Sequence, residues 1–145
     1  MDSILQYAYL LCNNNTKLNN FFQFSKNLKN NNLEPTKTSA SSVVANLDFK
    51  GSIETFPIIE AIKKNAGEAN WRQTYSISEV GEDFANRHCY FELIGPNGHF
   101  YNEAIRGFVC YWGEYLNYNW HSHEAEEIYY IFCLLYTSDA ADETT

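Results

Sequence analysis

The chain has 145 residues, of which 45% are hydrophobic and 17% aromatic, and its formal charge at pH 7 is −8. This composition suits one folded domain and excludes a disordered tail, because disordered chains are poor in aromatic residues. The acidic excess argues against a nucleic-acid partner, since phosphate contacts need a basic face. No apolar stretch reaches the roughly 18 residues of a membrane span, and the N-terminus lacks the features of a secretory signal. We therefore expect a cytoplasmic protein with neither nucleic-acid nor membrane partners.

The first part of the chain, residues 1–70, predicts a helical N-terminal extension. Short apolar segments at residues 4–11 and 21–28 predict two modest amphipathic helices between runs of asparagine. Residues 33–45 contain Pro35 and a cluster of Ser and Thr, which predicts a linker.

Two further helices are predicted before the character of the sequence changes. A helix is expected at residues 54–66, where Pro57 suits the first turn and isoleucines form an apolar stripe. Ser76 and Glu79 have the spacing of a capping box, which predicts a short helix that ends near Asn86.

Residues 71–132 predict the first part of an antiparallel β-barrel. Runs rich in aromatic and β-branched residues alternate with glycine-containing turns, as is typical of short strands in sandwiches and barrels. The predicted strands are residues 89–94, 105–112, 114–123 and 126–132. The expected fold class is therefore α+β, with a helical extension followed by an incomplete barrel.

One short segment carries the residues of a metal site. In a strand, alternate side chains share a face, so His121, His123, Glu127 and Tyr129 have the same parity. Two imidazoles and one carboxylate suit a single divalent transition metal, such as Zn, Fe, Mn, Co or Ni. A helix would separate the two histidines by about 200° and make no site. The alternative is that both histidines lie at a solvated strand edge beside an acidic turn.

The pattern H-x-H-x-x-x-E-x-Y resembles the first metal motif of the cupin superfamily. The flanking sequence is similar to the cupin-type dimethylsulfoniopropionate lyases over about residues 70–132. The segments that carry this similarity are Trp71–Tyr75, Glu79–Gly81, Tyr90–Pro96, Gly98–Phe100, Arg106–Gly107, Tyr111–Gly113, Trp120–Glu127 and Tyr129.

The resemblance implies a cupin or jelly-roll barrel and a β-elimination that converts dimethylsulfoniopropionate to dimethyl sulfide and acrylate. It implies His121, His123 and Glu127 as metal ligands and Tyr129 as the catalytic base. The substrate is a small zwitterion, whose sulfonium end favours aromatic faces. Among the aromatic residues between 111 and 120, proximity to the motif favours Tyr118 and Trp120 as substrate-binding residues.

The last 13 residues, 133–145, break the family pattern. Residues Cys133–Glu143 read like the translation of a sequencing-library adapter, so we expect residues 133–145 to be an artefact. Cupin sites usually take a further histidine from a later strand, so we expect the 145-residue chain to be an inactive fragment. The full-length protein is a candidate homodimer.

Two other functions stay open at the level of sequence. One is another metal-dependent cupin reaction on a small carboxylate, such as an oxygenase or isomerase. The other is a cupin that binds a small ligand without catalysis. A further histidine on a later strand would favour catalysis, and a replaced ligand would favour the binding module.

Overall fold

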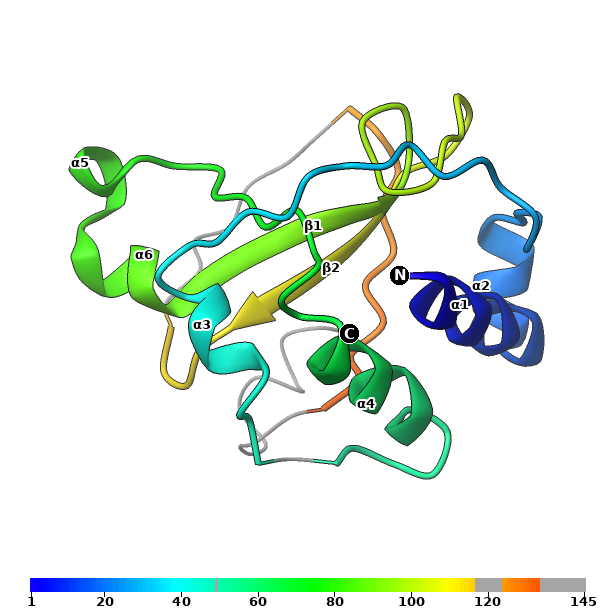
Figure 1. Cartoon of the computed structure of the whole chain (residues 1–145). Helices are drawn as coiled ribbons and strands as arrows, with labels where there is room; N and C mark the ends of the chain where they lie inside the picture. Colours follow the sequence, from blue (N-terminus) through cyan, green and yellow to red (C-terminus); the bar gives the residue numbers. More distant parts are fainter. Residues whose placement is uncertain (49, 117–123, 134–145) are drawn as a thin grey trace.

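The computed structural model describes residues 1–48, 50–116 and 124–133 (Figure 1). In chain order the elements are α1 (Asp2–Asn14), α2 (Thr16–Phe21), α3 (Ser41–Val44), α4 (Phe56–Lys64), α5 (Ile77–Val80), α6 (Glu82–Arg87), β1 (His88–Ile94) and β2 (Gly107–Trp112). Within these ranges, the helices are too short or too polar to cross a membrane.

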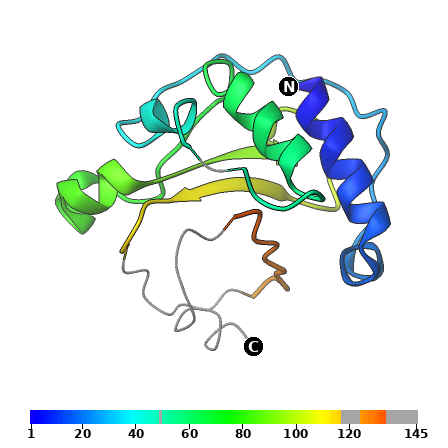
Figure 2. The same ribbon diagram turned by 90° about the horizontal axis from the view of Figure 1, so that it is seen from below.

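Strands β1 and β2 form an antiparallel pair that divides the described chain into two sides. Their register pairs His88 with Trp112 and Phe91 with Val109. Because side chains alternate along a strand, Phe91 and Val109 point into the core, whereas Trp112 points to the opposite side. Helices α1, α3 and α4 are drawn above the strands and residues 124–133 below them in Figure 2.

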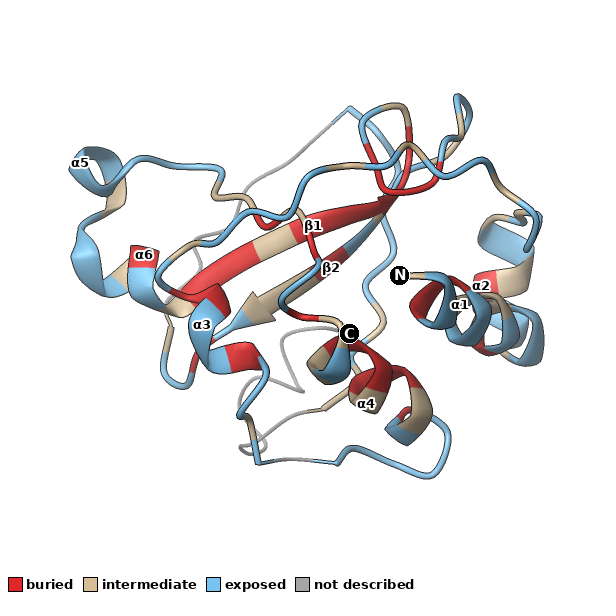
Figure 3. Cartoon of the chain, in the orientation of Figure 1, coloured by how far each residue is buried: buried red, intermediate tan, exposed pale blue. Residues whose placement is uncertain are grey.

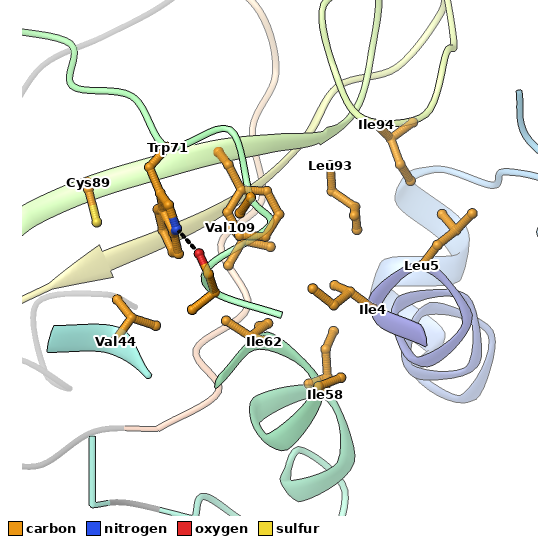
Figure 4. Close-up of a cluster of buried hydrophobic side chains, with 14 of the residues drawn as sticks. Ile4, Leu5, Val44, Ile58, Ile62, Trp71, Cys89, Leu93, Ile94 and Val109 are labelled. Atoms are coloured by element: carbon orange, nitrogen blue, oxygen red, sulfur yellow. Dashed lines mark hydrogen bonds between the residues drawn. The ribbon is translucent and has the colours of Figure 1, made fainter. Parts of the chain in front are cut away.

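The N-terminal helices and the strands share one hydrophobic core. The core includes Ile4 of α1, Ile62 of α4 and Phe91 of β1, all buried (Figures 3 and 4). The Trp71 ring meets Phe91 edge-to-face at 4.9 Å, and its Nε1 donates a 2.7 Å hydrogen bond to the carbonyl of Ala66. The predicted extension is thus packed against the sheet.

The helix predicted at residues 4–11 is confirmed as α1, but the helix predicted at 21–28 is wrong. The Asn15 side chain accepts from the Leu18 backbone N–H at 3.1 Å and so starts a separate helix, α2. That helix ends at Phe21, because Phe22 takes an extended conformation. The rings of Phe22 and Phe24 stack at 5.8 Å in this extended segment.

The segment predicted as a linker, residues 33–45, packs against the rest of the molecule. It contains α3, and Ala40 and Val44 belong to the shared core. The Thr36 hydroxyl donates a 2.6 Å hydrogen bond to the carbonyl of Trp71. These contacts bind the segment to the start of the sheet.

The predictions for the two later helices are confirmed, with one correction. Helix α4 begins at Phe56 with Pro57 in its first turn, as expected. The capping box of Ser76 and Glu79 is present at the start of α5. The predicted single helix is instead two, because Gly81 has a φ of 85° and separates α5 from α6.

Strands β1 and β2 confirm two predicted strands, and a third prediction is wrong. Residues 126–132 are irregular, and the Phe132 carbonyl at their end accepts a hydrogen bond from the Thr55 side chain. Residues 117–123, the greater part of the strand predicted at 114–123, lie outside the described residues. Helices with a small antiparallel sheet confirm the α+β class, and the first part of a barrel stays a prediction.

Candidate active site

Glu127 and Tyr129 lie together on one side of the irregular segment that ends at Phe132. The Tyr129 hydroxyl donates a 3.0 Å hydrogen bond to Oε2 of Glu127. Both side chains are exposed, and Tyr129 retains 60% of its accessible surface. Two residues of equal parity therefore share a side, although the backbone between them is not a strand.

Strand β2 provides the surface beneath this pair. The Tyr129 ring meets the Trp112 ring at 6.3 Å with an interplanar angle of 63°. Burial, and then the negative charge of Glu127, raise the pKa of the Cys110 thiol to about 12. Cys110 and Trp112 are two residues apart on β2, so they point to the same side and reach the same segment.

The far side of the Trp112 ring contacts His88. The two ring centroids are 5.7 Å apart, and His88 also lies 5.2 Å from Phe84. His88 is buried, and this burial lowers its pKa. Rings of His88, Trp112 and Tyr129 thus form a continuous series, which supports the exposed tyrosine from the strand pair.

The remaining predicted site residues fall in the part of the chain that the structure leaves undescribed. These are His121, His123, Tyr118 and Trp120. Among the residues that are described, no group of three or more His, Cys, Asp or Glu side chains could hold a metal ion. The Glu127 carboxylate is exposed and adjacent to a phenol, so its chemistry fits one ligand of a divalent metal.

Cys110 is a neighbour of the site that the sequence did not indicate, and Trp112 was among the aromatic candidates but was not favoured. Proximity along the chain favoured Tyr118 and Trp120, whereas Trp112 reaches Tyr129 across space. The sequence signal that could have indicated these two residues was the alternation of side chains along β2. It places Cys110 and Trp112 opposite to the buried Val109, on the side away from the core.

A charged cluster lies near the opposite end of β1. Glu92 is 2% exposed, and its carboxylate lies 3.5 Å from Arg72 Nη1 and 4.0 Å from Arg106 Nε. Arg72 also donates to the Asn97 carbonyl at 2.6 Å. Within the described residues, Oε1 of Glu92 has no hydrogen-bond partner. Arg72 thus connects strand β1, through Glu92, to the turn that follows this strand, through Asn97.

His99 is a buried histidine that accepts a backbone hydrogen bond. It is 3% exposed, and its Nε2 accepts a 3.0 Å hydrogen bond from the backbone N–H of Asn70. Burial, followed by the charges of the N-terminal amino group and Arg72, lowers the His99 pKa to about 4. The ring is therefore neutral at pH 7 and able to accept this bond.

Comparison with known families identifies the family of the chain. The model of the dimethylsulfoniopropionate lyase family matches residues 14–141. The chain belongs to the dimethylsulfoniopropionate (DMSP) lyase family. This match covers more of the chain than the segment from residue 70 on which the resemblance was based. It also extends into residues 133–141, so the adapter origin of the C-terminal segment stays a prediction.

A curated relative within this family is the dimethylsulfoniopropionate lyase DddQ of Ruegeria pomeroyi. It is 43% identical over 63 residues, which are 43% of this chain and 31% of the relative. The conserved length is thus a small part of that enzyme.

Solved DMSP lyases share the fold of the chain. A chain from the crystal structures of the DMSP lyases RdDddP and RnDddQII matches with a TM-score of 0.72 and 28% identity. This match covers 77% of the present chain and 57% of the solved one. The crystal structure of DddQ from Ruegeria pomeroyi has a TM-score of 0.69 at 23% identity and covers 75% and 55%, respectively. The chain therefore spans little more than half the length of these DMSP lyases.

Proposed function

We propose that this chain carries the catalytic motif of a metal-dependent DMSP lyase, which eliminates dimethyl sulfide from DMSP and leaves acrylate. Membership of the DMSP lyase family supports the reaction class. The observation that carries the proposal is the contact between Tyr129 and Glu127, which brings a candidate base beside a candidate metal ligand.

One divalent transition metal, of the group Zn, Fe, Mn, Co and Ni, is proposed to bind Glu127 together with His121 and His123. When bound, such a metal withdraws electron density from a substrate carboxylate and thereby acidifies the adjacent carbon. While the Tyr129 phenol is protonated, its hydrogen bond orients the Glu127 carboxylate, and this bond is lost when the phenol is deprotonated to act as the base.

The proton is proposed to pass to the phenol oxygen of Tyr129. This oxygen, in its deprotonated form, takes the proton from the carbon next to the substrate carboxylate, and the electron pair of that C–H bond forms the new double bond. The bond between carbon and the sulfonium sulfur breaks, and its electrons leave with neutral dimethyl sulfide. Because Tyr129 is 60% exposed, water can remove the proton from the phenol afterwards.

The sulfonium end of the substrate is proposed to bind aromatic faces. Cation–π attraction is worth about 0.5–2 kcal/mol for each ring. Tyr118 and Trp120 are candidates from the sequence, and Trp112 is a candidate from its contact with Tyr129. Trp112 is 39% exposed, so part of its ring surface is open to a ligand.

The test is release of dimethyl sulfide, measured by gas chromatography of the headspace, with acrylate measured in solution. Because the chain spans only part of its relatives, the assay uses the longest natural protein that contains residues 1–132. Tyr129→Phe is expected to lower kcat at least about 100-fold, since a positioned general base contributes about 10² or more.

Tyr101→Phe is the matched control for this variant. The Tyr101 phenol is also exposed and has a carboxylate two residues away, that of Glu103, which raises its pKa, but it lies outside the motif. The control is expected to retain parental activity. Absence of dimethyl sulfide release by the parent protein, or equal activity of Tyr129→Phe and the parent, would contradict the proposal.

A further inference from the structure

The turn at residues 51–55, directly before α4, contacts the segment that carries the motif. The Thr55 hydroxyl donates a 2.9 Å hydrogen bond to the backbone carbonyl of Phe132. Burial, followed by the nearby Glu54 carboxylate, raises the pKa of the Tyr130 hydroxyl. Thr55 is only 3% exposed, so its bond to Phe132 is shielded from water. The end of the motif segment accordingly lies beside α4 in Figure 1.

Hydrogen bonds within the turn hold the Thr55 side chain in place. Its oxygen accepts a 2.9 Å hydrogen bond from the Ser52 backbone N–H, and the Ser52 hydroxyl accepts from the Thr55 N–H at 3.2 Å. The Phe56 N–H also donates to the Ser52 carbonyl at 2.8 Å. The Thr55 hydroxyl also lies 3.1 Å from the Ser52 hydroxyl, so the two hydroxyls and the Phe132 carbonyl belong to one hydrogen-bonded network.

Gly51 permits the close approach of the two segments. Its φ is 71°, a conformation that residues with a side chain rarely adopt. A Cβ at this position would lie 2.9 Å from the Phe132 carbonyl oxygen and 2.4 Å from the Thr55 hydroxyl. A side chain at Gly51 would therefore have to displace Thr55, Ile59 or the Phe132 carbonyl.

The two sides of the motif segment have different neighbours. Tyr129 contacts Trp112 of β2, whereas Tyr130 and the Phe132 carbonyl contact the turn before α4. Within the described residues this irregular segment lacks the ladder hydrogen bonds that fix a strand. These contacts, together with the packing of Phe132 against the core, therefore help to fix its position.

We propose that the turn formed by residues 51–55 is a positioning element, which holds Glu127 and Tyr129 at the place where the motif acts. The helical N-terminal part of the chain thereby has a role in the site, with Thr55 as its principal residue. The catalytic part of this inference rests on the proposed lyase function. A base and a ligand must be held within about 0.5 Å of their productive positions, which an irregular segment achieves only with such support.

The first experiment measures backbone hydrogen exchange of the 145-residue chain by mass spectrometry. Thr55→Val keeps the shape of the side chain but removes the donor to Phe132. Exchange in residues 127–132 is expected to become about fivefold faster, the effect of losing one partly buried hydrogen bond. Thr55→Ser keeps the hydroxyl and is expected to restore the parental rate. Gly51→Ala is expected to accelerate the same residues by displacing them.

The matched control is Thr36→Val. The Thr36 hydroxyl also donates to a backbone carbonyl distant in sequence, that of Trp71, but it does not touch the motif segment. This variant is expected to leave exchange in residues 127–132 unchanged. Unchanged exchange in Thr55→Val, or the same acceleration in Thr36→Val, would overturn the proposal.

The second experiment separates positioning from mere stability, in the natural protein used for the lyase assay. Thr55→Val is expected to lower kcat about tenfold with little change in KM, because misplacement affects the transition state more than substrate binding. Thr55→Ser is expected to recover kcat. An active protein whose kcat is insensitive to Thr55→Val would overturn the positioning role. Failure of the parent to release dimethyl sulfide would refute the lyase proposal instead, while the exchange contrast would still decide whether the turn holds the segment.

Discussion

The phenol of Tyr129 and the carboxylate of Glu127 are joined by a 3.0 Å hydrogen bond on the exposed side of an irregular segment. Neither group is buried, so the bond is not needed to satisfy a polar atom within the core. This contact is the observation on which the proposed roles of the two residues rest.

Glu127→Gln is expected to weaken metal binding and lyase activity by at least about tenfold, because an amide is a poorer ligand for a divalent metal than a carboxylate. Metal content after dialysis and kcat/KM for DMSP measure the effect. Glu126→Gln is the control, since Glu126 is exposed and has the opposite parity. Equal losses in both variants would point to a general charge effect.

The cluster around Glu92 predicts an asymmetric pair of variants. Arg72→Met leaves the 2%-exposed carboxylate without its nearest partner, and we expect a loss of about 3 kcal/mol in the free energy of unfolding. Glu92→Gln removes the buried charge itself, while Arg72 keeps its bond to the Asn97 carbonyl and is partly hydrated. The Glu92→Gln variant should therefore lose less free energy of unfolding than Arg72→Met. Urea unfolding at pH 7 compares the two variants. A larger loss in Glu92→Gln than in Arg72→Met would contradict the interpretation that Arg72 compensates the buried Glu92 charge.

His99 predicts a loss of stability in mild acid. Its pKa is about 4 in the folded protein and 6.5 in the unfolded chain, so between these values the unfolded state binds the additional proton. The free energy of unfolding should therefore be constant above about pH 7 on this account and decrease as the pH falls from 6.5 towards 4. Between pH 7 and pH 5 the expected loss is roughly 2 kcal/mol.

Urea unfolding of the parent and of His99→Gln at both pH values measures this contribution. Glutamine can accept the hydrogen bond from Asn70 without gaining a proton. The variant should lose less free energy of unfolding on acidification than the parent. Some pH dependence should remain in the variant, because burial also lowers the pKa of His88. An identical pH profile in parent and variant would refute the prediction.

Three of the four cysteines should be slow to react in the folded protein. Burial raises the pKa of Cys12 to about 11 and that of Cys89 and Cys110 to about 12, so at pH 8 only about one thiol in 10³ or fewer is ionised. A chromogenic disulfide reagent should therefore label these thiols slowly at pH 8 and rapidly in urea. Rapid labelling of Cys89, which is 0% exposed, would contradict the described core.

Local sequence patterns determined much of the secondary structure. The capping box at Ser76, the proline in the first turn of α4 and the aromatic runs of β1 and β2 were all readable, because each depends on residues a few positions apart. The shared parity of Glu127 and Tyr129 was also readable, and their side chains do meet. The sequence likewise indicated the family, through the motif and the similarity of the segments that flank it over about residues 70–132.

Tertiary packing decided the environment of that motif. Residues 126–132 have the composition of a strand, yet their carbonyl at Phe132 binds Thr55, 77 positions away in the chain. Likewise, Trp112 rather than a nearer aromatic residue supports Tyr129 among the described contacts. A periodic pattern specifies which side chains share a side, because that follows from backbone geometry. Which surface covers that side depends on how segments far apart in sequence pack together, and no local spacing records this.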